Sequence, residues 1–371
     1  MLLAHKIALD PTPIQRNYFA RAAGTARFTW NWALNRWNEI EKAGGKPDYA
    51  ALSREFTQIY KTEYPWVSEV LATAHTRVFL HLNTAFREFW KKKRKRPRFH
   101  GKKSGKHDSF YIQPGQLKLD GKRVAIPLLG WVKMRESLRF EGKIQGSSVS
   151  RQGNRWYIAI QVNVGEVYRR ERTDNHVSGV DLGISALATI ANESTTEQVS
   201  GPKPLEFYLR KKRYLGRELS RRTKGSKNWW KTVWKIRRLD SRIANLRKES
   251  LHTLTTRLCR ENQAIGIEDL NVRGMSANRK LARRIADMGF YEFRRQLDYK
   301  AALYDTHIVI ADRWFPSSKA CSRCGAIKED LTLSQRVFRC DCGFAENRDV
   351  NAANNLRTLA QSETDACGHD G

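Results

Sequence analysis

The stretch VSGVDLGISALATI, residues 177–190, decides how the second half of the chain folds. It reads as one strongly apolar strand that a single acid, Asp181, interrupts. A carboxylate in such a strand is costly to bury as an ion unless it is paired or bound to a metal. Asp181 therefore needs a partner, unless it only accepts backbone hydrogen bonds in a turn with Gly183.

Two further apolar strands follow along the chain. AIGIEDL, residues 264–270, carries Glu268 near its end, and THIVIAD spans residues 306–312. Long basic helical patterns over residues 204–222 and 227–262 separate the first strand from the second. This alternation of strands and helices predicts an α/β layer with a largely buried sheet.

Four cysteines then crowd into one short window. Cys321-x2-Cys324-Gly and Cys340-x-Cys342-Gly each present two thiols from a tight turn. In a basic chain without a secretory profile this spacing favours a closed, structural zinc site over disulfides. The second pair is one residue shorter than the usual spacing, so we expect a distorted turn or a less tightly held metal.

A helical pattern, RDVNAANNL, starts directly after the cysteines and places Asp349 in its first turn. Asp349 could be an ordinary helix N-cap, and Glu268 could be a solvent-facing strand end. Acids on a first strand, on a later strand and on a final helix are the layout of RNase H-like nucleases. If folding gathers Asp181, Glu268 and Asp349, two Mg²⁺ ions about 3.5–4 Å apart would relieve their repulsion and support phosphodiester hydrolysis.

The first half of the chain has a different texture. Residues 11–107 have helical periodicity, and TPIQ at residues 12–15 predicts a capped helix start. This part ends in KKKRKRPRFHGKKSGKH, residues 91–107, with ten Lys or Arg and no acid. The run is a solvated linker or a phosphate-binding segment, of which we favour the second. Residues 108–166 show short alternating strands that predict a small β-barrel.

The charge of the whole chain points to a polyanion as partner. The 371 residues include 68 Lys and Arg against 38 Asp and Glu, a formal net charge of +30. Nucleic acid is the first candidate for such a balance. No stretch approaches the roughly 18–20 apolar residues that span a bilayer, and the amino-terminal residues lack a secretory profile. We therefore expect a cytoplasmic protein with no membrane partner.

Five motifs, in chain order, carry a resemblance to a known family: GVDLGI, GIEDLNVRGM, NRKLARRIADMGFYEFRRQLDYKA, FPSSKACSRCG and NRDVNAANNL. With these motifs the sequence resembles the TnpB family, which comprises the OrfB-type proteins of insertion sequences. The resemblance implies a multidomain α/β protein with a β-barrel. Its expected parts are a wedge-like β-barrel (1–10 and 108–166), a helical recognition domain (11–107), an RNase H-like (RuvC) nuclease domain (167–318 and 346–360), a zinc-ribbon insertion (319–345) and a flexible tail (361–371).

The resemblance also implies a function. TnpB proteins are RNA-guided DNA endonucleases related to type V CRISPR effectors, and they cut double-stranded DNA beside a short flanking motif. Asp181, Glu268 and Asp349 would be the catalytic, Mg²⁺-binding acids, and the four cysteines would hold structural Zn²⁺. The partners would be the target DNA and a guide RNA that is made from the end of the element. The protein would lie in a prokaryotic cytoplasm, and at the nucleoid when it is bound to DNA. The expected nucleic-acid contacts are Lys91, Lys92, Lys93, Arg94, Lys95, Arg96, Arg279 and Lys280.

Two other functions compete with cleavage. A nuclease-inactive, RNA-guided repressor would use the same surfaces, and the intact acids disfavour it. A transposase that joins DNA ends is disfavoured because no His-hydrophobic-His motif accompanies a catalytic tyrosine. Whether one or two copies bind each RNA stays open at this point.

Overall fold

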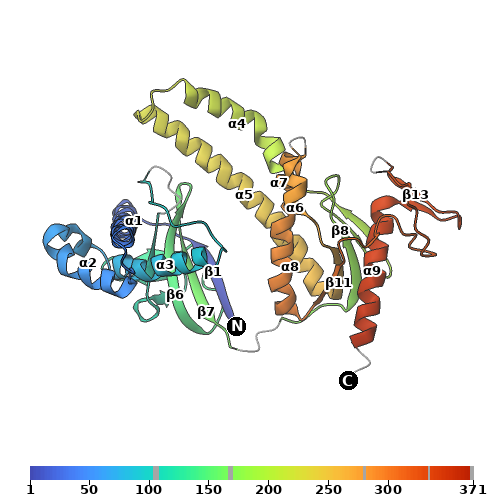
Figure 1. Cartoon of the computed structure of the whole chain (residues 1–371), viewed down its shortest axis with the longest axis horizontal. Coiled ribbons are helices and arrows are strands. Elements are labelled where there is room, and N and C mark those ends of the chain that lie inside the picture. Colours follow the sequence, from blue (N-terminus) through green and yellow to red (C-terminus); the bar gives the residue numbers. More distant parts are fainter. Residues whose placement is uncertain (103–107, 166–169, 279–280, 333–334, 368–371) are drawn as a thin grey trace. The chain divides into compact units, whose positions relative to one another are not determined.

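The chain divides into two compact units in the computed structural model, residues 1–167 and 168–371 (Figure 1). The structure describes residues 1–102, 108–165, 170–278, 281–332 and 335–367. Within these ranges no helix is long and apolar enough to cross a bilayer. Each unit is described by itself below.

The strands of the first unit form two antiparallel sheets. One sheet has the order β1-β7-β6-β2 and the other the order β3-β4-β5. An isolated bridge between Leu9 and Met134 joins them. In the described residues these pairings give two sheets around a shared core, and not the single closed barrel that was expected, because the short strands β3 to β5 fold back on one another as a meander. The strands are β1 (Leu2–Ala8), β2 (Ser109–Ile112), β3 (Lys118–Asp120), β4 (Arg123–Ile126), β5 (Gly130–Lys133), β6 (Lys143–Gln152) and β7 (Arg155–Asn163).

The helices of the first unit are α1 (Pro13–Lys42), α2 (Tyr49–Glu63) and α3 (Thr73–Trp90). The expected capping box at the start of α1 is present: Thr12 accepts from the Gln15 backbone N–H at 3.3 Å, and the Gln15 side chain accepts in return at 3.0 Å. The amino-terminal half of α1 packs against the sheets, and its second half joins a separate helical core with α2 and α3. One helix therefore belongs to both cores.

The second unit is built on a five-stranded mixed sheet with the order β10-β9-β8-β11-β12. β8 (His176–Asp181), β11 (Asn262–Glu268) and β12 (His307–Ala311) are parallel, as the alternation of strands and helices predicts. The single strand expected over residues 177–190 is wrong. The chain turns after Asp181 and returns as β9 (Ala188–Ala191), antiparallel to β8, and then as β10 (Thr196–Val199).

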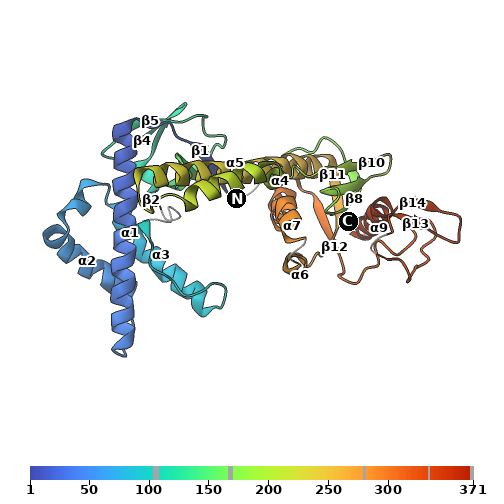
Figure 2. The same cartoon turned by 90° about the horizontal axis from the view of Figure 1, so that it is seen from above.

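Helices cover both faces of this sheet (Figures 1 and 2). The two long basic helices form as expected, and α5 packs with α8 on one face, while α9 lies on the other along β8 and β11. α9 continues past residue 361, where a flexible tail was expected to begin. The helices are α4 (Pro204–Ser220), α5 (Lys227–Glu261), α6 (Val272–Ala277), α7 (Ala282–Met288), α8 (Phe290–Tyr304) and α9 (Arg348–Cys367).

Two glycines let α9 lie directly on the sheet. Gly179 in β8 and Gly266 in β11 are register partners, so they sit side by side. A methyl group on Gly179 would overlap the backbone oxygen of Ala353, and one on Gly266 would overlap that of Leu356. The helix backbone therefore rests where side chains would otherwise stand, because only glycine permits such a close approach.

Gly179→Ala and Gly266→Ala test this contact. Each added methyl must push α9 off the sheet, so we expect a loss of unfolding free energy of about 1–3 kcal/mol or more, measured by urea denaturation. Gly216→Ala in α4 is the control, since its methyl meets nothing within 4 Å and alanine favours a helix by up to about 1 kcal/mol. Unchanged midpoints for both sheet variants would contradict the close approach.

Candidate functional site: an acidic cluster beside a four-cysteine centre

Asp181 and Glu268 end two adjacent parallel strands. β8 and β11 are in register up to Val180 and Ile267, so the next residues on each strand are Asp181 and Glu268. Register partners on parallel strands project to the same face, and neighbouring strands lie about 4.8 Å apart. Two residues further back on the same face are Gly179 and Gly266, which carry α9. The two acids therefore project toward the α9 side of the sheet.

Asp349 reaches this same point from the helix. Ala353 of α9 rests on Gly179, and Asp349 is one helical turn before Ala353, toward the end of β8 that carries Asp181. Asp349 is not the N-cap of α9, which was the alternative reading. Asn347 has that role, because its Oδ1 accepts from the backbone N–H of Asp349 at 2.9 Å and of Val350 at 3.4 Å.

The three carboxyl groups act on one another electrostatically. Burial and, after it, the nearby charges of Glu268 and Asp349 raise the pKa of Asp181 from 3.8 to about 8, and Arg348 opposes that rise. At neutral pH the metal-free cluster thus holds a proton at Asp181. A divalent cation bound here would take the place of that proton. Within the described ranges only the cysteines bring three or more ligand atoms within 4.8 Å of one another, so the acids form a wider cluster than a closed metal site.

Ser317 is a site residue that the sequence reasoning missed. Its hydroxyl donates to Oε1 of Glu268, and its backbone oxygen accepts from Asn355 Nδ2 of α9 at 2.7 Å. Ser317 is buried, so this contact fixes the orientation of Glu268 from the loop after β12. The FPSSK motif contained the residue, but nothing in its pattern indicates which serine faces a carboxylate.

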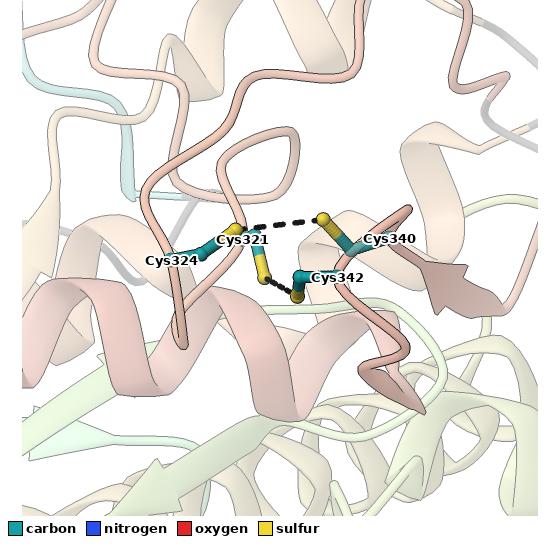
Figure 3. A group of neighbouring side chains, drawn as sticks. All are labelled: Cys321, Cys324, Cys340 and Cys342. Carbon is teal, nitrogen blue, oxygen red and sulfur yellow. Dashed lines mark hydrogen bonds between the residues drawn. The ribbon is translucent and has the colours of Figure 1, made fainter.

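The four cysteines come together as expected (Figure 3). Their sulfur atoms all lie within 4.8 Å of one another; Cys321 and Cys342 are 3.8 Å apart, and Cys324 and Cys340 are 3.6 Å apart. A tetrahedral Zn²⁺ with bonds of about 2.3 Å requires sulfur separations of about 3.8 Å. The two measured separations match this value, and the other sulfur pairs, within 4.8 Å, lie close enough for small side-chain shifts to complete a tetrahedral zinc site.

The shorter second knuckle is accommodated by a tighter turn. In the first knuckle Gly325 N–H donates to the oxygen of Cys321, four residues back, at 2.8 Å. In the second, Gly343 N–H donates to Cys340, three residues back, at 3.0 Å. Both glycines have positive φ, +79° and +82°, which L side chains rarely adopt. The missing residue thus shortens the turn, and the sulfur positions are kept, so the expected distortion is not found.

The cysteine loop is attached to α9 and so to Asp349. Its hairpin pairs β13 (Val337–Arg339) with β14 (Ala345–Asn347), and Asn347 is both the last residue of β14 and the cap of α9. Asn351 of α9 accepts from Ser322 N–H at 2.9 Å and donates to the oxygen of Ala320 at 2.7 Å. The cysteine loop is therefore attached to the first turn of α9 at its start, through Asn347, and at its end, through Asn351.

The basic residues 91–96 after α3 are exposed, but one of them is already engaged in an ion pair. Lys91 to Lys95 are exposed, whereas Arg96 pairs with Glu41 of α1 and donates to Asn38 at 3.0 Å. His100 stacks on Trp30 with ring centres 4.4 Å apart. This segment is therefore attached to α1. Arg279 and Lys280, the other expected contacts, lie outside the described residues.

The fold and site together define a class: an α/β protein in which acids from two strands and one helix gather at the carboxyl edge of a mixed sheet, beside a cluster of four cysteines. Three family models match this chain. The OrfB_IS605 model, described as "Probable transposase", matches residues 159–279, and the Cas12f1-like TNB domain matches residues 290–356. A model described as a helix-turn-helix domain matches residues 1–46, which here hold β1 and the whole of a single helix, α1.

Curated relatives match over nearly the whole chain. The chain is 34% identical to "Putative RNA-guided DNA endonuclease" of Streptomyces pristinaespiralis, over 98% of this chain and 90% of that protein. It is also 34% identical to "Putative RNA-guided DNA endonuclease InsQ" of Escherichia coli K12, over 99% of this chain and 94% of that protein. The chain belongs to the OrfB (TnpB) family of insertion-sequence proteins, which confirms the resemblance.

A solved structure shares the fold. The cryo-EM structure of the Cas12f1-sgRNA-target DNA complex matches with a TM-score of 0.58 at 15% identity, over 91% of this chain and 82% of that chain. At this identity the likeness concerns the fold alone.

Cys342→Ser tests the cysteine centre. A tetrahedral site with three remaining thiols loses most of its affinity for zinc, so we expect bound zinc to fall well below about one ion per chain, measured by elemental analysis of the purified protein. Hydrogen exchange should rise in the loop and in the first turn of α9. Cys259→Ala is the control, since Cys259 is buried in α5 and should leave the zinc content unchanged. Equal zinc in both variants would contradict the site.

The raised pKa of Asp181 predicts a pH dependence without divalent cations in the buffer. The folded chain keeps this proton up to about pH 8, and the unfolded chain releases it near 3.8, so stability falls as pH rises through that window. Asp181→Asn has no such proton. We expect the unfolding free energy of the parent, relative to this variant, to decrease between pH 5 and 8 by at most about 1.4 kcal/mol per pH unit. Parallel pH profiles would contradict the prediction.

Proposed function

We propose that the protein is an RNA-guided DNA endonuclease of a transposable element, which cleaves double-stranded DNA by metal-dependent hydrolysis. The observation that carries this proposal is the convergence of Asp181, Glu268 and Asp349 in a chain 34% identical to relatives named as such endonucleases. The part that holds these acids would be a RuvC-type, RNase H-like nuclease domain.

The three acids would hold Mg²⁺, and two ions balance the charge of three carboxylates better than one does. When bound, the ions would activate a water and stabilise the leaving oxygen of the phosphodiester. Asp181 would release its proton and, with Glu268 and Asp349, supply hard oxygen ligands of the kind Mg²⁺ prefers. Ser317 would keep one oxygen of Glu268 engaged, so that the other faces the cations.

The remaining charge suits a guide-dependent protein. An RNA–DNA heteroduplex is held through its backbone while base pairing supplies sequence choice, so broad positive charge matters more than base-reading side chains. The net charge of +30 supports this role. Lys91 to Lys95 would bind phosphate groups of the guide RNA or the DNA, and the two sheets of the first unit would grip the RNA scaffold. Arg96 would contribute less, because it is paired with Glu41.

The test is a cleavage assay with the whole complex. The protein is co-expressed with RNA from the end of its own element, purified, and mixed with Mg²⁺ and a plasmid library that carries a guide-matched target next to a randomised flank. We expect cleavage that depends on one short flanking motif. Asp181→Ala should reduce cleavage by several orders of magnitude while the protein still binds the RNA.

A matched control separates the acids of the site from acids in general. Asp365→Asn changes an exposed acid on α9, the helix that carries Asp349, and should leave cleavage unchanged. Binding of the library without cleavage by the parent would favour the nuclease-inactive repressor. Strand-transfer products would favour a transposase.

A further inference from the structure

Trp314 is the most exposed of the large apolar side chains in the described residues, with 86% of its surface open to solvent. It stands three residues after the end of β12, in the loop that also carries Ser317. Large exposed indoles mark binding sites more often than chance, because leaving them in water forgoes a large burial energy. An exposed indole on the loop that places Ser317 against Glu268 is therefore a candidate binding surface.

The backbone beneath Trp314 is held in a defined turn. Asp312 Oδ1 accepts from the Trp314 N–H at 2.8 Å, and the Asp312 oxygen accepts from the Phe315 N–H at 2.9 Å. Ser317 N–H then donates to the oxygen of Phe315 at 2.8 Å. The indole is thus presented by an ordered loop, which is what a stacking surface requires.

A hollow of about 890 Å³ opens beside this loop, between α8 and the carboxyl ends of β11 and β12, and Glu268 is the member of the acidic cluster that lines it. Glu268 lines it from β11, Trp314 from the loop, and Tyr291, which is 74% exposed, from α8. Two flat aromatic rings and a carboxylate of the site thus border one groove, which we call the Trp314 groove. Its volume is sufficient for a nucleotide, since pockets for small molecules measure about 300–1,000 Å³.

The charges on the groove suit the sugar–phosphate of a nucleotide. Arg273, Arg294 and Arg313 line it. Arg313 is paired with Asp269 at 2.8 Å and Arg294 with Asp298 at 2.8 Å. Arg273 is exposed and has no ion pair within the described part of the chain. It is the cation best placed to meet a phosphate.

We propose that the Trp314 groove binds one unpaired base of the DNA strand being cut, next to the scissile phosphate, by stacking it on Trp314 with Tyr291 as the second wall. This rests on the proposed nuclease function. Aromatic stacking requires a base with a free face, which single-stranded DNA offers and a duplex covers. The groove thereby selects unwound DNA at the point where the acids act.

Trp314 is then a positioning residue with a direct connection to the site. Its loop continues to Ser317, which donates to Glu268 and is held by Asn355 of α9. A base stacked on the indole would set the distance between its phosphate and Glu268, since both depend on the same loop. Stacking contributes about 1–3 kcal/mol per base, which corresponds to roughly 5- to 150-fold in rate or affinity.

The experiment compares the parent with Trp314→Ala and Trp314→Phe in the full RNA complex, on pre-unwound targets that each carry one abasic site within three nucleotides of the mapped cut. On intact DNA, Trp314→Ala should cut roughly 5- to 150-fold more slowly, and Trp314→Phe should recover most of the rate. At one abasic position the parent should slow to the rate of Trp314→Ala, which should itself not change further. Phe207→Ala changes a comparably exposed aromatic side chain (79%) on α4 and is the control, which should show no such dependence.

A second readout does not need cleavage. In the Asp181→Ala complex, 2-aminopurine at that same position should be quenched, and Trp314→Ala should relieve the quenching. Two results would overturn the groove assignment while the nuclease proposal stands. In the first, Trp314→Ala cuts as fast as the parent. In the second, at every abasic position the rate reductions caused by Trp314→Ala and by the abasic site multiply, which shows that they act independently. If the parent cuts nothing, the nuclease proposal fails, and the absence of quenching then removes the groove proposal as well.

Discussion

The contact of α9 with the sheet through Gly179 and Gly266 is the constraint on which the acidic site depends. The helix can approach the strands to backbone distance because neither register partner has a side chain. That approach sets the height of Asp349 above the sheet. A larger residue at either position would lift the helix and separate Asp349 from Asp181, although neither glycine touches an acid.

The cysteine centre acts on the same helix from outside the sheet. Asn347 ends β14 and caps α9, so the loop and the helix share a residue. Asn351 and Asn355 then attach the first two turns of α9 to the loop before and within the first knuckle. A metal that orders this loop therefore orders the helix start, and the third acid is placed from two sides.

The parts of the site that were predictable are those that local pattern determines. An acid within an apolar strand is conspicuous, and the cysteine spacing specifies a tetrahedral set, so Asp181, Glu268 and the four thiols could be found by inspection. The hairpin after Asp181 could not, because its residues are apolar on both sides of the turn and periodicity alone reads them as one strand. Ser317 was missed since a hydroxyl facing a carboxylate is a tertiary contact. The strands of the first unit form where alternation predicts them, but in two sheets and not in one closed barrel, because which edges meet is decided by packing.

The acidic cluster is an unfavourable feature within an otherwise basic chain, and this contrast has a physical consequence. Burial and two neighbouring carboxylates raise the pKa of Asp181 to about 8, so the cluster stays partly neutral when no cation is present. Nearby Arg348 opposes this rise less strongly than burial and the two carboxylates promote it, and its guanidinium donates to Thr332 at 3.0 Å and Ser318 at 3.1 Å in the loop. In the proposed nuclease, cations exchange for that proton, and the site then becomes an electropositive surface that suits a phosphodiester. The basic remainder of the chain would bring nucleic acid to the molecule, while the exchange at Asp181 would restrict chemistry to one edge of one sheet.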